Sequence, residues 1–369
     1  MALTSEEVKR LAGECGFELA GVSAPDPLED FERFQAWRSE GLAGEMKYLT
    51  DHRGDMRSDP RRLLASVQSI VCVGKLYNTP HPHSVELAAG DQTAEDAGKG
   101  GQGSAWISRY AWGEDYHDVL RAGLEQLRDR IAEVHGEPFE WKICVDTAPL
   151  LERSYARQAG LGWIGKNTCL INQQQGSWFF LGELLLSIPL APGMPQPDRC
   201  GTCRRCIDAC PTDALVTGEN GTTLDARLCI SYLTIEKRGS IPDELAGKIT
   251  NHVFGCDICQ DVCPWNARAL HTSEPSFQPG AFAPALQTLA ALSEADFRAG
   301  FRHSPVWRTK YGGFLRNVAF AIGNTGGRET RTALERLTNH ENDDVRAAAI
   351  KALSIFDERF SQKPSQDSP

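Results

Sequence analysis

The sequence CGTCRRCIDACP, from Cys200 to Pro211, is the most informative part of the chain. Its cysteines follow the pattern C-x2-C-x2-C-x3-C-P, which is the spacing of bacterial ferredoxins. In such a run, three thiolates hold three corners of one cubane iron–sulfur cluster, and the cysteine before the proline ligates a second cluster. The stretch therefore predicts a module with two clusters, built for electron transfer.

A second cysteine set, in GCDICQDVCPWN at residues 255–266, completes the ligand count. It repeats the end of the motif but lacks the first cysteine, and Cys229 in RLCISYLTIE is the substitute that we expect. Crossed ligation assigns cluster one to Cys200, Cys203, Cys206 and Cys263, and cluster two to Cys210, Cys229, Cys256 and Cys259. Zinc sites also use C-x2-C pairs, but they do not need the x3-C-P ending. Eight thiolates thus predict two 4Fe–4S clusters.

The other features of the chain indicate a redox protein of the cytoplasm. MALTSEEVKR at the start has no apolar signal core, so we expect no export, and a disulfide framework is not expected in a reducing compartment. The longest apolar run, residues 179–189, is interrupted by Gly182 and Glu183 and is too short to cross a membrane. We expect a cytoplasmic monomer with no membrane contact. The four cysteines outside the cluster sets are expected to be structural: Cys15, Cys72, Cys144 and Cys169.

Charge is unevenly distributed along the chain. The net charge of the 369 residues is −10, which argues against a polyanionic partner. Residues 298–351, however, contain ten Lys or Arg and five Asp or Glu, so this segment is net positive by five. Local charge matters more than the total for docking nucleic acid. A solvated helical surface is the alternative interpretation.

The chain divides into segments of different pattern. Residues 1–190 read as mixed α/β, with strands expected at FELAGVS, SIVCVGKLYN and WKICVD and helices at 28–40, 115–135 and LLERSYARQAG. CLINQQQGSWFFLGELLLSI reads as two strands around a turn at Gly176, and the Gly-rich residues 84–104 as a mobile loop. The Pro-rich residues 189–199 mark a boundary. We expect a ferredoxin-like domain at 191–270, HEAT-like helical hairpins at 271–358 and a disordered tail at 359–369.

Four blocks in this order resemble the epoxyqueuosine reductase family: ISRYAWGEDYH (107–117), VDTAPLLERSYARQAGLGWIGKNTCLI (145–171), CISYLTIE (229–236) and GCDICQDVCPWN (255–266). The resemblance extends over nearly the whole chain. It implies an N-terminal cobalamin-binding domain like that of reductive dehalogenases, with cobalamin between this domain and the two clusters. It also implies reduction of epoxyqueuosine at the tRNA wobble position to queuosine, the last step of queuosine biosynthesis, with an electron donor that the sequence does not identify. A dehalogenase-like enzyme and a ferredoxin-type electron carrier are the alternatives.

The resemblance also implies roles for single residues. The proton donor of the family falls on Asp146, at the end of an expected strand; the alternative is a helix N-cap. A donor at neutral pH would need a raised pKa. Cobalamin contacts are implied for Arg57, Asp146, Asn167, Thr168 and Ser231, with a surface arginine and a plain turn as alternatives. Lys166 and Tyr232 lie next to these positions, and His117 is expected to be a helix-start residue and not a cobalt ligand.

For tRNA, the basic C-terminal segment supplies the candidate residues. Arg308, Lys310 and Arg316 are expected to contact phosphates and not bases. Trp307 and Tyr311 are interleaved with these residues, but core packing explains both equally well.

Overall fold

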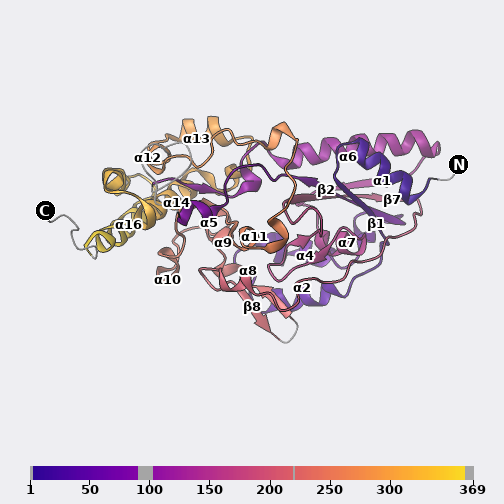
Figure 1. The fold of residues 1–369 in the computed structure, drawn as a ribbon, viewed down its shortest axis with the longest axis horizontal. Helices are drawn as coiled ribbons and strands as arrows, with labels where there is room; N and C mark the ends of the chain where they lie inside the picture. The colour runs from indigo at the N-terminus through magenta and orange to yellow at the C-terminus, as the bar shows by residue number, and fades with distance from the viewer. Residues whose placement is uncertain (1–2, 90–102, 219–220, 362–369) are drawn as a thin grey trace.

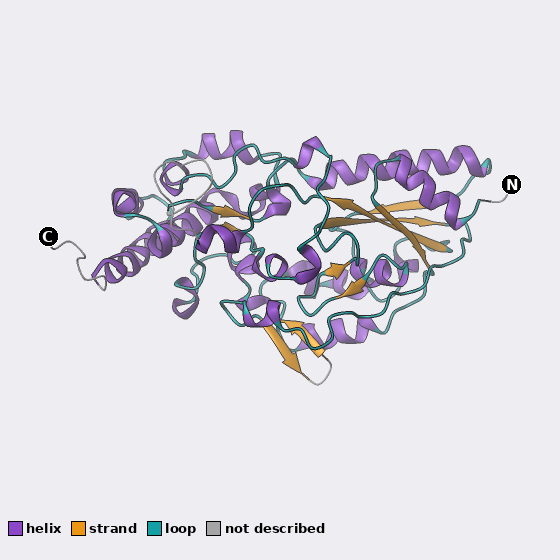
Figure 2. Ribbon diagram, viewed as in Figure 1, coloured by secondary structure: helices purple, strands orange, loops and turns teal. Residues whose placement is uncertain are grey.

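The computed structural model describes residues 3–89, 103–218 and 221–361. The molecule is elongated, with the two ends of the chain at opposite ends of its long axis (Figure 1). A sheet and its covering helices form the N-terminal end, and helices form the C-terminal end. The cysteine-bearing segment lies between them (Figures 1 and 2).

The main sheet has four antiparallel strands in the order β1-β2-β7-β4. The two inner strands pair with each other along eight residues. They are rich in Val, Ile and Leu because both of their faces are covered. The strands are β1 (Leu19–Ser23), β2 (Ser69–Leu76), β7 (Phe179–Leu186) and β4 (Trp141–Cys144). The strands predicted at residues 17–23, 69–78 and 141–146 are therefore confirmed.

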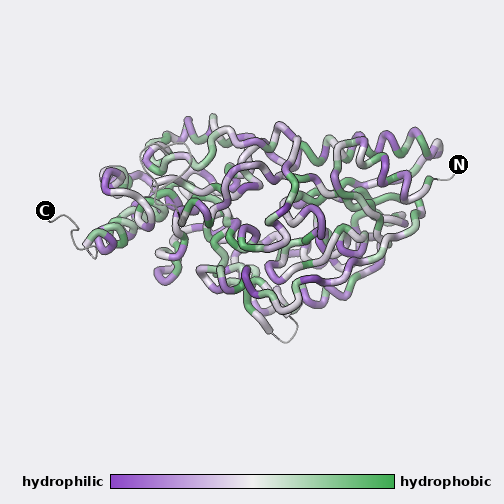
Figure 3. The backbone as a smooth tube through the Cα atoms, in the orientation of Figure 1, coloured by the Kyte–Doolittle hydropathy of each residue, from purple (hydrophilic) through white to green (hydrophobic). Residues whose placement is uncertain are grey.

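Helices cover both faces of this sheet. On one face lie α1 (Ser5–Glu14), which begins at the N-cap Thr4, and α6 (Tyr116–His135). The buried side of α6 has Leu120, Leu124, Leu127 and Ile131 at helical spacing. In Figure 3 hydrophobic (green) and hydrophilic (purple) stretches alternate along this helix. On the other face, α7 (Glu152–Gln158) packs on β2 and β7. The N-terminal half is thus a mixed α/β layer structure, as predicted.

Three short strand pairs lie outside the main sheet. They are β5 (Trp163–Ile164) with β6 (Leu170–Ile171), β8 (Leu215–Gly218) with β9 (Gly221–Leu224), and β3 (Trp106–Ile107) with β10 (His252–Phe254). The two strands expected around a turn at Gly176 are present as β6 and β7, but they do not pair with each other. Asn172 and Gly176 close a short turn, but β6 pairs with β5 while β7 enters the main sheet.

The cysteine-bearing segment and the C-terminal helices share one hydrophobic core. This core joins residues of α9 (Ile230–Ile235) and β10 to residues of α14 (Lys310–Thr325) and α16 (Asp343–Ser361). The boundary expected at residue 270 therefore does not separate two cores; the other expected boundaries, and the HEAT-like assignment, stay predictions. The remaining helices are α2 (Asp30–Ser39), α3 (Lys47–Thr50), α4 (His52–Met56), α5 (Ser84–Ala89), α8 (Arg205–Asp208), α10 (Asp243–Ala246), α11 (Ile258–Asp261), α12 (Leu286–Ala290), α13 (Glu294–Phe301) and α15 (Arg331–Leu337).

Two expected irregular segments meet the limits of the described chain. The start of the loop expected at 84–104 is the helix α5, and residues 90–102 lie outside the described residues. The tail expected from residue 359 begins later, because α16 continues to Ser361, and residues 362–369 again lie outside the described residues. In the described part of the chain, no helix combines the length and apolarity that a membrane span requires.

Candidate functional site

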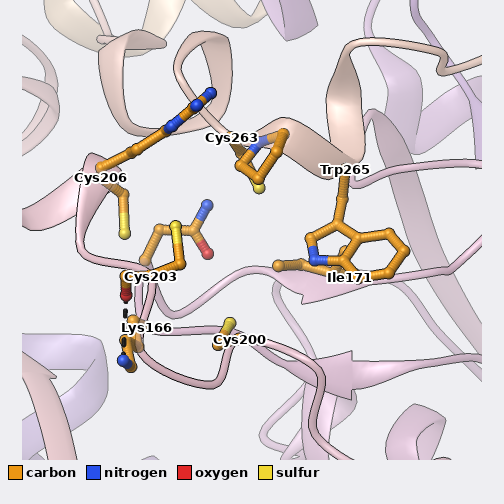
Figure 4. Close-up of a pocket in the computed structure, with 10 residues that line it drawn as sticks. Lys166, Ile171, Cys200, Cys203, Cys206, Cys263 and Trp265 are labelled. Atoms are coloured by element: carbon orange, nitrogen blue, oxygen red, sulfur yellow. Dashed lines mark hydrogen bonds between the residues drawn. The ribbon is translucent and has the colours of Figure 1, made fainter.

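Four cysteines from two distant loops line one cavity. Cys200, Cys203 and Cys206 come from the first motif, and Cys263 joins them from the second (Figure 4). Trp265 and Ile171 close the cavity on the side opposite Cys206. This is the set that the crossed assignment gives to cluster one.

The cysteines assigned to cluster two also lie close to one another: Cys210, Cys229, Cys256 and Cys259. Burial raises the pKa of the Cys229 thiol, and the charge of Cys210 adds to this rise. Burial also raises the pKa of Cys256, and the charges of Cys229 and Cys210 act in the same direction. Cys259 is in turn influenced by Cys256 and Cys229. The backbone N–H of Ala214 donates to Cys210 Sγ at 3.3 Å. In the described chain, no three His, Cys, Asp or Glu side chains are close enough to hold a single metal ion; the ligands of a cubane bind separate irons and stand further apart.

The GLGWIGKNT segment connects the α/β layer to the cluster loops. Lys166 Nζ donates to the carbonyl oxygens of Gly201 at 2.6 Å and Cys203 at 2.9 Å (Figure 4). Asn167 is buried, and its Nδ2 donates to the carbonyl oxygen of Cys259 at 3.3 Å. Thr168 follows with a φ of 63°, which few residues with a Cβ adopt. These residues therefore position the two cysteine sets against the sheet.

Asp146 lies just beyond the end of β4, on an exposed loop. Its φ is 47°, in the left-handed region, and 40% of its side-chain surface is exposed. The alternative interpretation as a helix cap is wrong, because α7 begins at Glu152 and its N-cap residue is Leu151. Strained backbone of this kind is found at functional sites more often than elsewhere.

Side chains from several elements surround the Asp146 carboxylate. His117 Nε2, from the first turn of α6, is 3.2 Å from Asp146 Oδ2. Arg308 Nη1, from the C-terminal segment, is 4.0 Å from the same oxygen. The Tyr116 ring lies beside His117, with ring centroids 4.2 Å apart. His117 Nδ1 also contacts Asp115 Oδ1 at 2.6 Å, so both of its ring nitrogens have partners.

These contacts decide where the proton resides. Desolvation acts to raise the pKa of Asp146, but the hydrogen bond and charge of His117 and the charge of Arg308 outweigh it, so the pKa is lowered. Desolvation acts to lower the pKa of His117, but Asp115 and Asp146 raise that pKa to about 9. In this structure the pKa of Asp146 is therefore lowered and that of His117 is raised, which favours the proton on His117 at neutral pH.

Arg308 belongs to this site, although 40% of its side-chain surface is exposed. Its Nη2 is 2.8 Å from Glu236 Oε1, and its guanidinium lies 5.3 Å from the centre of the Tyr48 ring. Next to it is a cavity of about 170 Å³, lined among others by Tyr110, His117 and Arg302. The α/β layer, the cluster segment and the C-terminal segment therefore all contribute residues to one site.

The other predicted cofactor contacts are placed as follows. Arg57 is 7% exposed and its Nη1 donates to the carbonyl oxygens of Arg53 and Tyr48, so the alternative of a surface arginine is wrong. Ser231 is half-buried in the first turn of α9, next to Cys229. The Tyr232 hydroxyl accepts a hydrogen bond from the backbone N–H of Glu45 at 2.9 Å, so its ring packs on the loop before α3.

The predicted phosphate contacts separate into three cases. Lys310 is exposed, with Nζ 4.9 Å from the centre of the Trp307 ring, and it stays a candidate. Arg308 is paired with Glu236 in the site described above. The prediction for Arg316 must be corrected: it is 2% exposed, and its guanidinium donates to the carbonyl oxygens of Leu233, Lys237 and Gly239. An arginine held in this way has no free donor for a phosphate.

Some residues of the site were not predicted from the sequence. The sequence predicts His117 only as a helix-start residue, and it gives no role to Glu236 or Tyr48. A signal existed for His117, because it follows Asp115 in a block that carries the family resemblance. For Glu236 and Tyr48 no local pattern indicates that the chain brings them together.

Comparison with known proteins identifies the same two parts of the chain. Residues 199–266 match a family model described as a 4Fe-4S double cluster binding domain, and residues 57–147 match one described as epoxyqueuosine reductase QueG. The epoxyqueuosine reductase of Xanthomonas campestris is 42% identical over 339 residues, which are 91% of each chain.

Two solved structures have the same fold. An epoxyqueuosine reductase crystallised with an epoxyqueuosine-modified tRNA stem loop has a TM-score of 0.81 at 29% identity and covers 98% of this chain and 94% of its own. The Bacillus subtilis epoxyqueuosine reductase, with a catalytic loop swung out of its active site, has a TM-score of 0.72 at 28% identity over 95% of this chain and 98% of its own. The chain belongs to the epoxyqueuosine reductase family.

Proposed function

We propose that this protein reduces epoxyqueuosine in tRNA to queuosine, using cobalamin supplied with electrons by two 4Fe–4S clusters. The observation that carries the proposal is the arrangement around Asp146. A protonated histidine and an arginine surround an exposed carboxylate on a strained loop, and the arginine is in turn paired with Glu236 of the cluster segment, so all three segments contribute. A structural carboxylate would not need this arrangement.

The reaction requires protons as well as electrons. Removing the epoxide oxygen breaks two C–O bonds, forms one C=C bond and releases water, and it consumes two electrons and two protons. The oxygen becomes basic as its bonds break, so an acid placed beside it accelerates the step. Asp146 is the group that would face the substrate, and it can take the proton that His117 holds 3.2 Å away. Arg308 would stabilise the negative charge that forms when that proton is given up.

The residues present fit cobalamin in their chemistry. Bound cobalamin supplies a strongly reducing cobalt centre that can attack an epoxide. The corrin rim consists of uncharged amides, and the candidate contacts offer matching uncharged groups in Asn167, Thr168 and Ser231 between the sheet and the cluster loops. Glu152, close to Arg57, has a buried Oε1 with no hydrogen-bond partner among the described residues. His117 is not available as a cobalt ligand, because both of its ring nitrogens are already bonded.

The proposed tRNA contact lies beside this cavity. Arg302 and Lys310 are exposed there, whereas several basic residues of α15 and α16 form ion pairs, among them Arg331 with Asp357 and Arg346 with Asp343. Arg302 and Lys310 would therefore supply positive charge for docking near the site. A related enzyme of the same fold was crystallised with a modified tRNA stem loop, which supports the same kind of substrate.

The test is nucleoside analysis of tRNA from bacteria that lack their own epoxyqueuosine reductase. Expression of this chain in such cells is expected to replace epoxyqueuosine by queuosine. A matched strain expressing the Cys203→Ala variant, which loses one ligand of cluster one, should keep epoxyqueuosine. Persistence of epoxyqueuosine with the wild-type chain, present at normal level and carrying iron, would contradict the proposal.

A further inference from the structure

Glu183 is a carboxyl group in the interior of the main sheet. Its side chain is 0% exposed, and neither oxygen has a hydrogen-bond partner within the described chain. The strand register places Cys72 of β2 and Cys144 of β4 directly across from it. Thiols are weak donors and cannot replace the water that a carboxylate loses on burial. Burial therefore raises the pKa of Glu183 far above its ordinary value, and the group is a neutral acid.

Glu152 is the second carboxyl group below the site. It begins α7, which packs on β7, and the backbone N–H of Asp146 faces its carboxyl group. Its Oε1 is buried without a hydrogen-bond partner in the described residues. Burial, and then the charge of Asp146, raises the pKa of Glu152 well above its ordinary value. Glu152 therefore also holds a proton near neutral pH.

The three carboxyl groups form a series from the sheet interior to the exposed loop. Cys144, the partner of Glu183 in β4, is the last residue of that strand and precedes Asp146 by two residues. Glu152 and Asp146 are the two charges that act on Glu183. The titratable and charged groups that face this series from the surrounding elements are Cys72, Cys144, Arg57, Arg153, Tyr116, His117 and Arg308.

We propose that Glu152 and Glu183 form a proton store that supplies Asp146 with the second proton of the reaction. The inference rests on the proposed function, in which each epoxide consumes two electrons from the clusters and two protons. Asp146 takes the first proton from His117 and passes it to the oxygen, and it then takes the second from the Glu152 carboxyl group. The oxygen leaves as water, and His117 and the carboxyl pair recover their protons from solvent through Asp146 between turnovers. Glu152 and Glu183 act through Asp146 and do not touch the substrate.

The first test does not depend on turnover. Infrared spectra of the cluster-loaded protein at neutral pH should contain the carbonyl band of protonated carboxylic acids, shifted in deuterated water. Glu152→Gln and Glu183→Gln should each remove part of this band. Glu140→Gln should keep it, because Glu140 is an exposed carboxylate just before β4. Absence of the band from the wild-type protein would overturn the proposal, even if the protein makes queuosine.

The second test measures the supply of protons during turnover. Glu152→Gln and Glu183→Gln should bind tRNA and iron normally but turn over roughly 10²-fold more slowly, at the low end for a lost proton donor. Their solvent deuterium isotope effect should exceed that of the wild type. Wild-type rates in both variants across the pH range would refute the store. If Glu183→Gln does not fold, Glu152→Gln decides alone; failure of the wild type to make queuosine, with the infrared band present, would count against the proposed function instead.

Discussion

His117 Nε2 lies 3.2 Å from Asp146 Oδ2, so the first turn of α6 carries the proton partner of the carboxylate that follows β4. The two side chains remain partly open to solvent, at 27% and 40% exposure. Because the pair is accessible and charged, it can exchange a proton with a bound substrate. This relationship makes the protonation of His117, and not that of Asp146 alone, the property that controls the site at neutral pH.

The first prediction concerns pH. The pKa of His117 is raised from 6.5 to about 9, so its charge is present at neutral pH and is lost as pH rises through about 9. Turnover should fall in the same window, as should the stability that the His117–Asp146 ion pair contributes. His117→Gln should lower turnover by roughly 10²-fold and remove this alkaline limb.

His135→Gln, at the other end of α6, is the matched control and should change neither the rate nor the pH profile. Steady-state rates measured across the pH range provide the check. An alkaline limb that persists unchanged in His117→Gln would show that another group titrates.

The second prediction concerns the metal. The protein prepared without oxygen should hold about eight irons and eight sulfides per chain, as two 4Fe–4S clusters require. Cys229→Ala should reduce this to about four irons and leave cluster one, whose ligands line the separate cavity in Figure 4. Iron analysis and electron paramagnetic resonance spectra provide the measurement. Full iron content in Cys229→Ala would exclude Cys229 as a ligand, and stoichiometric zinc in place of iron would contradict both assignments.

The third prediction concerns tRNA. Lys310→Ala should weaken tRNA binding and reduce the slope of log affinity against log salt by roughly 0.7 to 0.9, the effect of one lost phosphate contact. Lys351→Ala should be nearly silent, because Lys351 lies on α16 and is paired with Asp243. Binding curves at several salt concentrations test both variants. An unchanged slope in Lys310→Ala would move the docking surface elsewhere.

The fourth prediction concerns Arg316, which the structure assigns to the shared core. Arg316→Leu removes the donor of three buried carbonyl groups, and each buried group left unpaired costs roughly 1–3 kcal/mol. We expect the thermal unfolding midpoint to fall by several degrees, whereas Arg336→Leu on the exposed face of α15 should leave it nearly unchanged. Unaltered stability together with weakened tRNA binding in Arg316→Leu would restore the original interpretation.

Local spacing accounts for what could be predicted from the sequence. The cysteine run carries its ligand geometry within a few residues, so Cys200, Cys203 and Cys206 were predicted together, and Cys263 followed from the partial repeat. The Val and Ile content of residues 69–76 similarly indicates a buried strand. Such features can be predicted because residues close together in the sequence determine them.

Contacts between segments that are distant in the sequence cannot be predicted from such local patterns. Arg308 and Arg316 lie in the same basic segment, yet Arg308 is close to Asp146 and Arg316 is buried against α9. Arg308 precedes α14 and Arg316 lies within it, so the packing of this helix decides the surroundings of each side chain. The pairing of β6 with β5 instead of β7 also depends on tertiary packing. Glu183 is visible in the sequence as a single carboxylate inside an apolar run. Without the fold, this pattern indicates only that the run is interrupted.

The most direct test of the central claim is the rate at which purified, cluster-loaded protein converts epoxyqueuosine in tRNA, with cobalamin and a chemical reductant, in wild-type and Asp146→Asn forms. Asn keeps the size and hydrogen-bonding shape of Asp but cannot pass on the proton. We expect queuosine from the wild type and a rate lower by roughly 10²- to 10⁴-fold in Asp146→Asn, with iron content and tRNA affinity unchanged. Equal rates in the two proteins, or no queuosine from the wild type, would contradict the claim.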